Sequence, residues 1–223
     1  MTERIVGDGY VKRSFEEWRD IVFREDPEKV DPWWSSLEGD QWDQPNHVVD
    51  HLTRLCRDPL PALDGLTDAQ INKGLWYLLG AWTQLYSTRV TGERSTTCIA
   101  TIYTLFELIF VPRCAPVLSH LNESGANDLN SICYIWWDEI GLHVKRWDRE
   151  RRDMDQAILD VMRRTLALPN VACQESALHG LGHNIRGYRD QVAVIIDEYL
   201  AANPDLRPEL RVYAENARIG HVL

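Results

Sequence analysis

The stretch that decides the fold class is Thr67-Asp-Ala-Gln-Ile-Asn-Lys-Gly-Leu-Trp-Tyr-Leu-Leu-Gly-Ala-Trp-Thr-Gln-Leu-Tyr86. Thr67 and Gln70 form the capping-box pattern that opens helices. Apolar side chains then recur at intervals of three and four residues, the spacing of one helix face. They are Ile71, Leu75, Leu78, Leu79, Trp82 and Leu85. The stretch therefore predicts a helix through Tyr86 with one face in a core.

Helix signals recur outward from this stretch, and no run alternates with period two for long. Ser14 and Glu17 form another capping box, and Asp31 before Pro32 is an N-cap pattern. We expect helices over about 14–25, 45–56, 95–112, 116–121, 127–142, 153–168, 170–185, 190–202 and 208–219. The breaks between them are short. The sequence predicts an all-α protein of antiparallel helix pairs, forming a single all-helical domain over residues 1–223.

Two C-terminal stretches echo each other. Pro169-Asn-Val-Ala-Cys-Gln-Glu-Ser-Ala-Leu-His-Gly-Leu-Gly182 and Pro208-Glu-Leu-Arg-Val-Tyr-Ala-Glu-Asn-Ala-Arg-Ile-Gly220 both start with proline and end in an apolar residue plus glycine. The separation of the two prolines, and that of the two final glycines, is near the period of paired-helix repeats. Residues 153–223 thus resemble the HEAT-repeat family, and the resemblance implies an α-solenoid at least C-terminally. The other reading is two unrelated helices with ordinary proline and glycine ends.

The charge is negative and unevenly placed. The chain of 223 residues has 24 Lys and Arg against 34 Asp and Glu, a net −10. Residues 1–68 hold 16 acids and 8 bases of these. Nucleic-acid binding needs a basic surface, so the balance argues against it and favours a basic protein partner. The basic run over 145–152 is the one feature that favours nucleic acid, and such runs are usually solvated.

Cysteine use and the N-terminus favour a cytoplasmic location. The five cysteines are widely spaced and include no CxxC pair, which predicts buried free thiols. The first ten residues hold no apolar signal segment. The most apolar stretch, from Cys98 to Pro112, is about 15 residues long and contains Glu107, too short and too polar to span a bilayer. We expect no membrane association.

Two histidine pairs have zinc-compatible spacing. His47 and His51, like His179 and His183, are four residues apart and would share a helix face. Further ligands are missing from the motif, and adding Glu175 to the second pair would spread three groups over about 12 Å of one helix. The sequence predicts no metal. A small helical metal-binding protein or enzyme that uses both pairs stays open as the alternative.

Motifs of the common enzymes are absent from the sequence. We find no nucleophile elbow, no phosphate-binding loop and no dinucleotide fingerprint. The glycines of His179-Gly-Leu-Gly-His183 sit in a helical pattern, where they favour close helix packing over phosphate binding. The sequence therefore predicts no catalytic residues and no cofactor, and it leans away from an enzyme.

Tryptophans gather among acids near the N-terminus. The chain has nine, and three of them lie in Asp31-Pro-Trp-Trp-Ser-Ser-Leu-Glu-Gly-Asp-Gln-Trp-Asp-Gln-Pro45. Aromatic side chains are strong interface anchors, so this segment is the expected partner-binding surface. Its candidate residues are Trp33, Trp34, Glu38, Asp40, Trp42 and Asp43. The alternative is that it folds back as a plug. The hypothesis is a non-enzymatic binder of a basic protein, in one version a bacterial immunity protein that neutralises a cationic toxin.

Overall fold

The computed structural model describes residues 13–24, 44–142 and 151–222. Of these residues 75% are helical and none is in a strand. The predicted all-α class is confirmed.

The helices follow one another with short connections. Their bounds are α1 Phe15–Phe23, α2 Pro45–Arg57, α3 Pro59–Ala62, α4 Asp68–Tyr77, η1 Leu79–Tyr86, α5 Gly92–Leu105, η2 Phe106–Phe110, α6 Val111–Arg113, η3 Ser119–Leu121, α7 Asp128–Glu139, α8 Arg152–Thr165, α9 Val171–Ala202 and α10 Pro208–Ala217. The short helix expected over 116–121 is a single 3₁₀ turn, η3.

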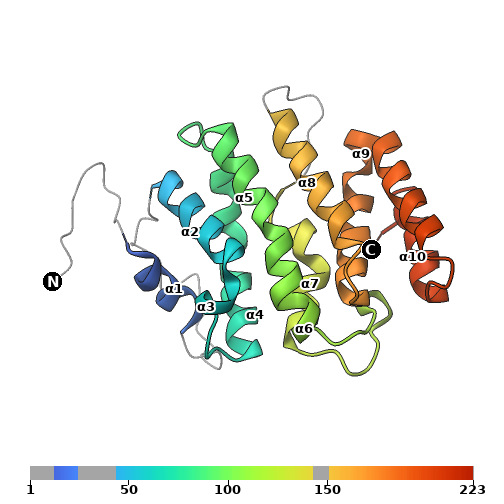
Figure 1. The fold of residues 1–223 in the computed structure, drawn as a ribbon, viewed down its shortest axis with the longest axis horizontal. Coiled ribbons are helices and arrows are strands. Elements are labelled where there is room, and N and C mark those ends of the chain that lie inside the picture. Colours follow the sequence, from blue (N-terminus) through green and yellow to red (C-terminus); the bar gives the residue numbers. More distant parts are fainter. Residues whose placement is uncertain (1–12, 25–43, 143–150, 223) are drawn as a thin grey trace.

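The long helices pack in two rows (Figure 1). In one row α2 contacts α5 and α5 contacts α8. In the other row α1 contacts α4 and α4 contacts α7. The helix α9 contacts both α7 and α8, and α10 packs on α9 at the end of the molecule away from α1. The rows therefore meet at α9.

The stretch from Thr67 to Tyr86 folds partly as predicted. Both hydrogen bonds of the capping box of Thr67 and Gln70 are present. The α-helix ends at Tyr77, however, and the chain continues as the 3₁₀ helix η1. The expected single helix is wrong from Leu78 onward. Gly80, a poor helix former, lies at this change, while Trp82 stays buried on the core side.

The apolar helix is longer than expected. The elements α5, η2 and α6 form one helical stretch of 22 residues, Gly92–Arg113. Among the described residues it is the one helix long and apolar enough to cross a membrane, so our expectation of a stretch too short and polar is wrong. In the most apolar 18 residues of this stretch, 44% are buried inside the protein. The core helix of a soluble protein can have the same length and composition, so these two properties do not distinguish a core helix from a membrane-spanning one.

The two echoing C-terminal stretches differ in where their prolines and glycines lie. The helices expected over 170–185 and 190–202 are both present within α9, where they are divided at Tyr188, whose φ of −140° and ψ of 48° are not helical. Gly182 lies inside α9, whereas Gly220 follows α10 with φ +80°. Pro208 starts α10, but Asn170 separates Pro169 from the first residue of α9. Similar sequence patterns thus serve different positions in the two helices.

One cluster of buried apolar side chains runs from Phe15 to Ala217. Aromatic rings form its centre, at the contact of η1, η2 and α7. They are Trp82, Phe106, Phe110, Trp136 and Trp137. All five cysteines are free and buried, as predicted.

Candidate functional site

The expected partner-binding residues lie outside the described residues. This holds for Trp33, Trp34, Glu38, Asp40, Trp42 and Asp43, and also for most of the basic run over 145–152. Their roles stay predictions.

The two histidine pairs have different surroundings. On α2, the His51 Nε2 atom lies 3.2 Å from the carbonyl oxygen of Arg13, and its ring packs on Phe15 and Trp18. The Nδ1 atom of His47 is buried without a hydrogen-bond partner in the described part of the chain. His51 is therefore held by α1 and by the backbone of Arg13, which precedes it.

The second pair lies on the first half of α9, where α7 approaches closely. The Asn170 side chain accepts a hydrogen bond from the Ala172 N–H and caps this helix. A Cβ at Gly180 would lie 2.6 Å from Trp137 Cβ, so only glycine leaves room for α7 here. This confirms that Gly180 serves helix packing. The approach also brings Asp138, the next residue of α7, to the histidines.

Three metal-competent groups come together at this contact. The Nε2 atoms of His179 and His183 are 3.2 Å apart. Asp138 Oδ1 is 4.0 Å from His183 Nδ1, and one ligand atom from each of the three residues lies within 4.8 Å of the others. Among the described residues this is the one such group of histidine, cysteine and acidic side chains.

A hydrogen-bonded chain continues from His179 into the protein. Its Nδ1 atom is 2.8 Å from the Tyr213 hydroxyl of α10, which is 3.2 Å from the Tyr134 hydroxyl of α7. The chain thus joins the three helices α7, α9 and α10. Sequence reasoning missed both tyrosines and Asp138, because no local motif links them to the histidine pair.

Burial sets the protonation of this cluster. It lowers the pKa of His179 to about 4, and the neighbouring charge of His183 acts in the same direction. Burial also raises the pKa of Tyr213, as does its hydrogen bond with Tyr134. At neutral pH, His179 is therefore a neutral imidazole and Tyr213 a neutral phenol.

Glu175 turns away from the pair that it precedes by one turn. Its fully buried carboxylate accepts hydrogen bonds from the backbone N–H groups of Ser119 and His120, at 2.8 and 2.9 Å. The His120 Nδ1 atom lies 2.5 Å from the same carboxylate, and its ring stacks on Tyr213 with centroids 4.2 Å apart. Glu175 therefore fixes the η3 segment against α9 and α10.

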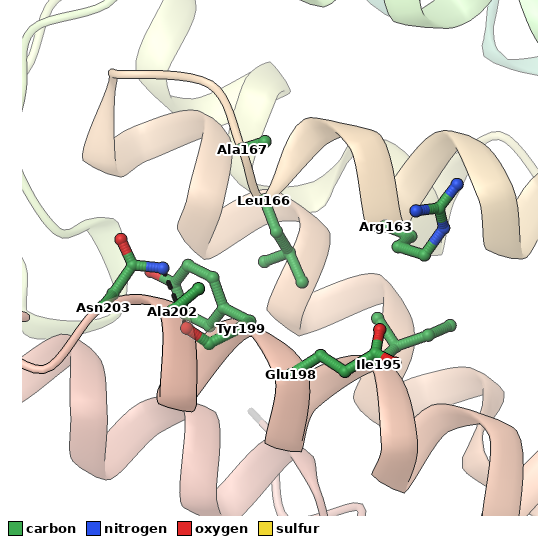
Figure 2. A pocket seen from close by; sticks show the side chains of 8 residues that line it. All are labelled: Arg163, Leu166, Ala167, Ile195, Glu198, Tyr199, Ala202 and Asn203. Carbon is green, nitrogen blue, oxygen red and sulfur yellow. Dashed lines mark hydrogen bonds between the residues drawn. The ribbon is translucent and has the colours of Figure 1, made fainter.

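A second feature is a cleft between α8 and α9, shown in Figure 2. Its volume is about 180 Å³. Buried Leu166, Ile195 and Tyr199 contribute apolar surface, while exposed Arg163 and Glu198 add opposite charges. The remaining lining residues are Ala167, Ala202 and Asn203.

These features offer two kinds of chemistry. Imidazole nitrogens with a carboxylate can ligate a transition metal, and the cleft can hold an apolar group beside a charged one.

No family model matches the sequence, and no curated protein or solved structure matches it.

Proposed function

We propose that this chain is a non-enzymatic binding protein that recognises a basic protein partner through the faces of its helices. The observation that carries the proposal is the cleft between α8 and α9. The helix faces around it present an apolar hollow with charges beside it, which is the anatomy of an anchor site in protein interfaces.

The size of the cleft favours a side chain over a small molecule. Ligand pockets enclose about 300–1,000 Å³. The cleft encloses about 180 Å³. That space suits one large apolar side chain inserted between Leu166 and Ile195, whereas a cofactor would stand largely outside it.

The charges give the partner its chemistry. Glu198 lies in the cleft lining and is exposed, so a lysine or arginine beside the inserted side chain would find an acceptor there. The net charge of −10 would speed the encounter with a basic protein. Arg163 on the other side is paired with Asp160 at 2.6 Å, which offsets its repulsion of a basic partner.

The finer architecture is part of the same proposal. We infer an α-solenoid of antiparallel helix pairs, HEAT-like in its C-terminal part, because stacked pairs create extended recognition surfaces. Support comes from the two rows of packed helices that meet at α9. The acidic tryptophan segment of residues 31–45 would add a second contact, and a bacterial immunity protein is one version of this function.

The experiment uses two neighbouring alanines at the end of α9. Both Ala201 and Ala202 are exposed, but only Ala202 lines the cleft. Tagged protein is incubated with lysate of the source cell at low and at high salt, and retained proteins are identified and quantified. We expect one basic protein in stoichiometric amount, lost with Ala202→Trp and retained with Ala201→Trp. The proposal would be contradicted if the Ala202→Trp variant retained the partner as well as wild type does, or if wild type retained no protein.

The alternative function is metal binding, and the structure favours it at only one of the two histidine pairs among the described residues. His179 and His183 have Asp138 beside them. The pair on α2 is not part of any such group among the described residues.

A further inference from the structure

We propose that Asp138, His179 and His183 bind one divalent transition-metal ion, with Zn²⁺ as the preferred occupant. The sequence pattern predicts no metal because α9 alone supplies two ligands. The helix α7 supplies the third group, and the resulting set of two imidazoles and one carboxylate is a known zinc ligand set.

The spacing of the two imidazoles fits a shared ion. Zinc binds histidine nitrogen at about 2.0–2.1 Å. Two nitrogens 3.2 Å apart would then subtend about 100° at the ion. That angle is close to tetrahedral, so a zinc ion can replace the present contact between His179 and His183 without a large movement of either ring.

A hydrogen bond orients the ring of His179 for metal binding. Its Nδ1 atom is 2.8 Å from the Tyr213 hydroxyl oxygen. With Nε2 on the metal, the Nδ1–H group would donate to that oxygen, which is how ligand histidines are commonly oriented. Tyr213 is thus a positioning residue for the site.

The site is open on one side. The side chains of Asp138 and His183 are 40% and 33% exposed, whereas His179 is buried. An ion can therefore enter from solvent, and the fourth position is left to water or another group, as in zinc sites with three protein ligands. Two imidazoles disfavour Mg²⁺ and Ca²⁺, which take oxygen ligands.

The test is isothermal titration calorimetry. The full chain is first stripped of metal with a chelator and is then titrated with ZnCl₂. Wild-type protein should bind one equivalent. His183→Gln and Asp138→Asn change partly exposed groups, which favours retention of the fold, and circular dichroism checks it. Each should weaken binding by more than the roughly 10–100-fold that loss of a second-shell partner costs. Tyr213→Phe should fall within that range.

Matched controls come from the same chain. Glu139→Gln removes an exposed acid next to Asp138 on α7, and His221→Gln removes an exposed histidine outside the group. Both variants should bind Zn²⁺ within about 2-fold of wild type. A wild type that binds no Zn²⁺, or equal affinity in wild type and His183→Gln, would overturn the proposal. Its outcome is independent of the pull-down, because the metal site and the cleft share no residue.

Discussion

The two histidine pairs share a spacing and differ in what packs against them. For the pair on α2, α1 supplies aromatic rings to His51, and Arg13 supplies a backbone carbonyl. On α9, α7 and α10 supply the Asp138 carboxylate and the Tyr213 hydroxyl. The same motif is therefore a packing element at one end of the molecule and a candidate metal site at the other. The neighbouring helix decides which.

The acid that lies nearest to each pair in the sequence of its own helix shows the same contrast. Asp50, on α2, is exposed and pairs with Arg94 of α5, also exposed. Glu175, on α9, is fully buried and accepts from two backbone N–H groups and His120. The acid on α9 is therefore part of the buried structure, whereas the acid on α2 lies at the surface.

The largest effect should come from Glu175→Met. It would leave two backbone N–H groups of the partly buried η3 segment without the acceptor that the fully buried carboxylate supplies, so we expect a loss of about 3–5 kcal/mol in the free energy of unfolding. Urea unfolding measures it. Glu175→Gln keeps one acceptor oxygen and should cost less. Equal stability of wild type and Glu175→Met would contradict a structural role for this carboxylate.

The next effect is a pH dependence that His179 contributes. Its pKa is about 4 in the folded protein, against an ordinary 6.5, chiefly because it is buried. The unfolded state therefore binds more protons, so this contribution is complete above pH 6.5 and is lost as pH falls toward 4. Between pH 6.5 and pH 4, we expect His179 to lose about 3 kcal/mol of its contribution to the free energy of unfolding.

Comparison of wild type with His179→Gln isolates this contribution, since His183, Asp138 and His120 are present in both proteins. Unfolding free energies measured between pH 7 and pH 4 should fall more steeply for wild type. Parallel curves for the two proteins would rule out the buried neutral imidazole.

Gly180→Ala tests the close approach of α7. The added Cβ would meet Trp137 Cβ at 2.6 Å and Met162 Cε at 2.9 Å. We expect the free energy of unfolding to fall by about 2 kcal/mol. This net value combines the cost of overpacking with the gain from the higher helix propensity of alanine. Gly92→Ala is the control, because its added Cβ meets nothing within 4 Å. A fully stable Gly180→Ala protein would show that α7 can move away freely.

The smallest effect should come from Asp50→Asn. The pair with Arg94 is exposed on both sides, so its loss should cost between 0 and about 1 kcal/mol in thermal or urea unfolding. A larger cost would mean that the α2 region depends on polar contacts as the α9 region does.

Local sequence signals predicted the helices better than the site. Capping boxes at Ser14 and Thr67 begin helices where expected, because their hydrogen bonds involve residues three apart. The end of α4 was missed, because apolar side chains three residues apart share a face in a 3₁₀ helix as well as in an α-helix.

The site depends on contacts between distant parts of the chain. The pair of His179 and His183 is visible as a pattern, but Tyr213 lies 34 residues after His179. Asp138 comes from another helix, α7, and its place depends on Trp137 packing at Gly180. No spacing rule within one helix could have found either group.

The most direct test of the central claim is a crystal structure of the protein grown with Zn²⁺, with anomalous scattering measured on both sides of the zinc absorption edge. We predict one anomalous peak about 2.0–2.2 Å from His179, His183 and Asp138 ligand atoms. Zinc bound elsewhere, or the two imidazoles still in direct contact with no peak between them, would contradict it.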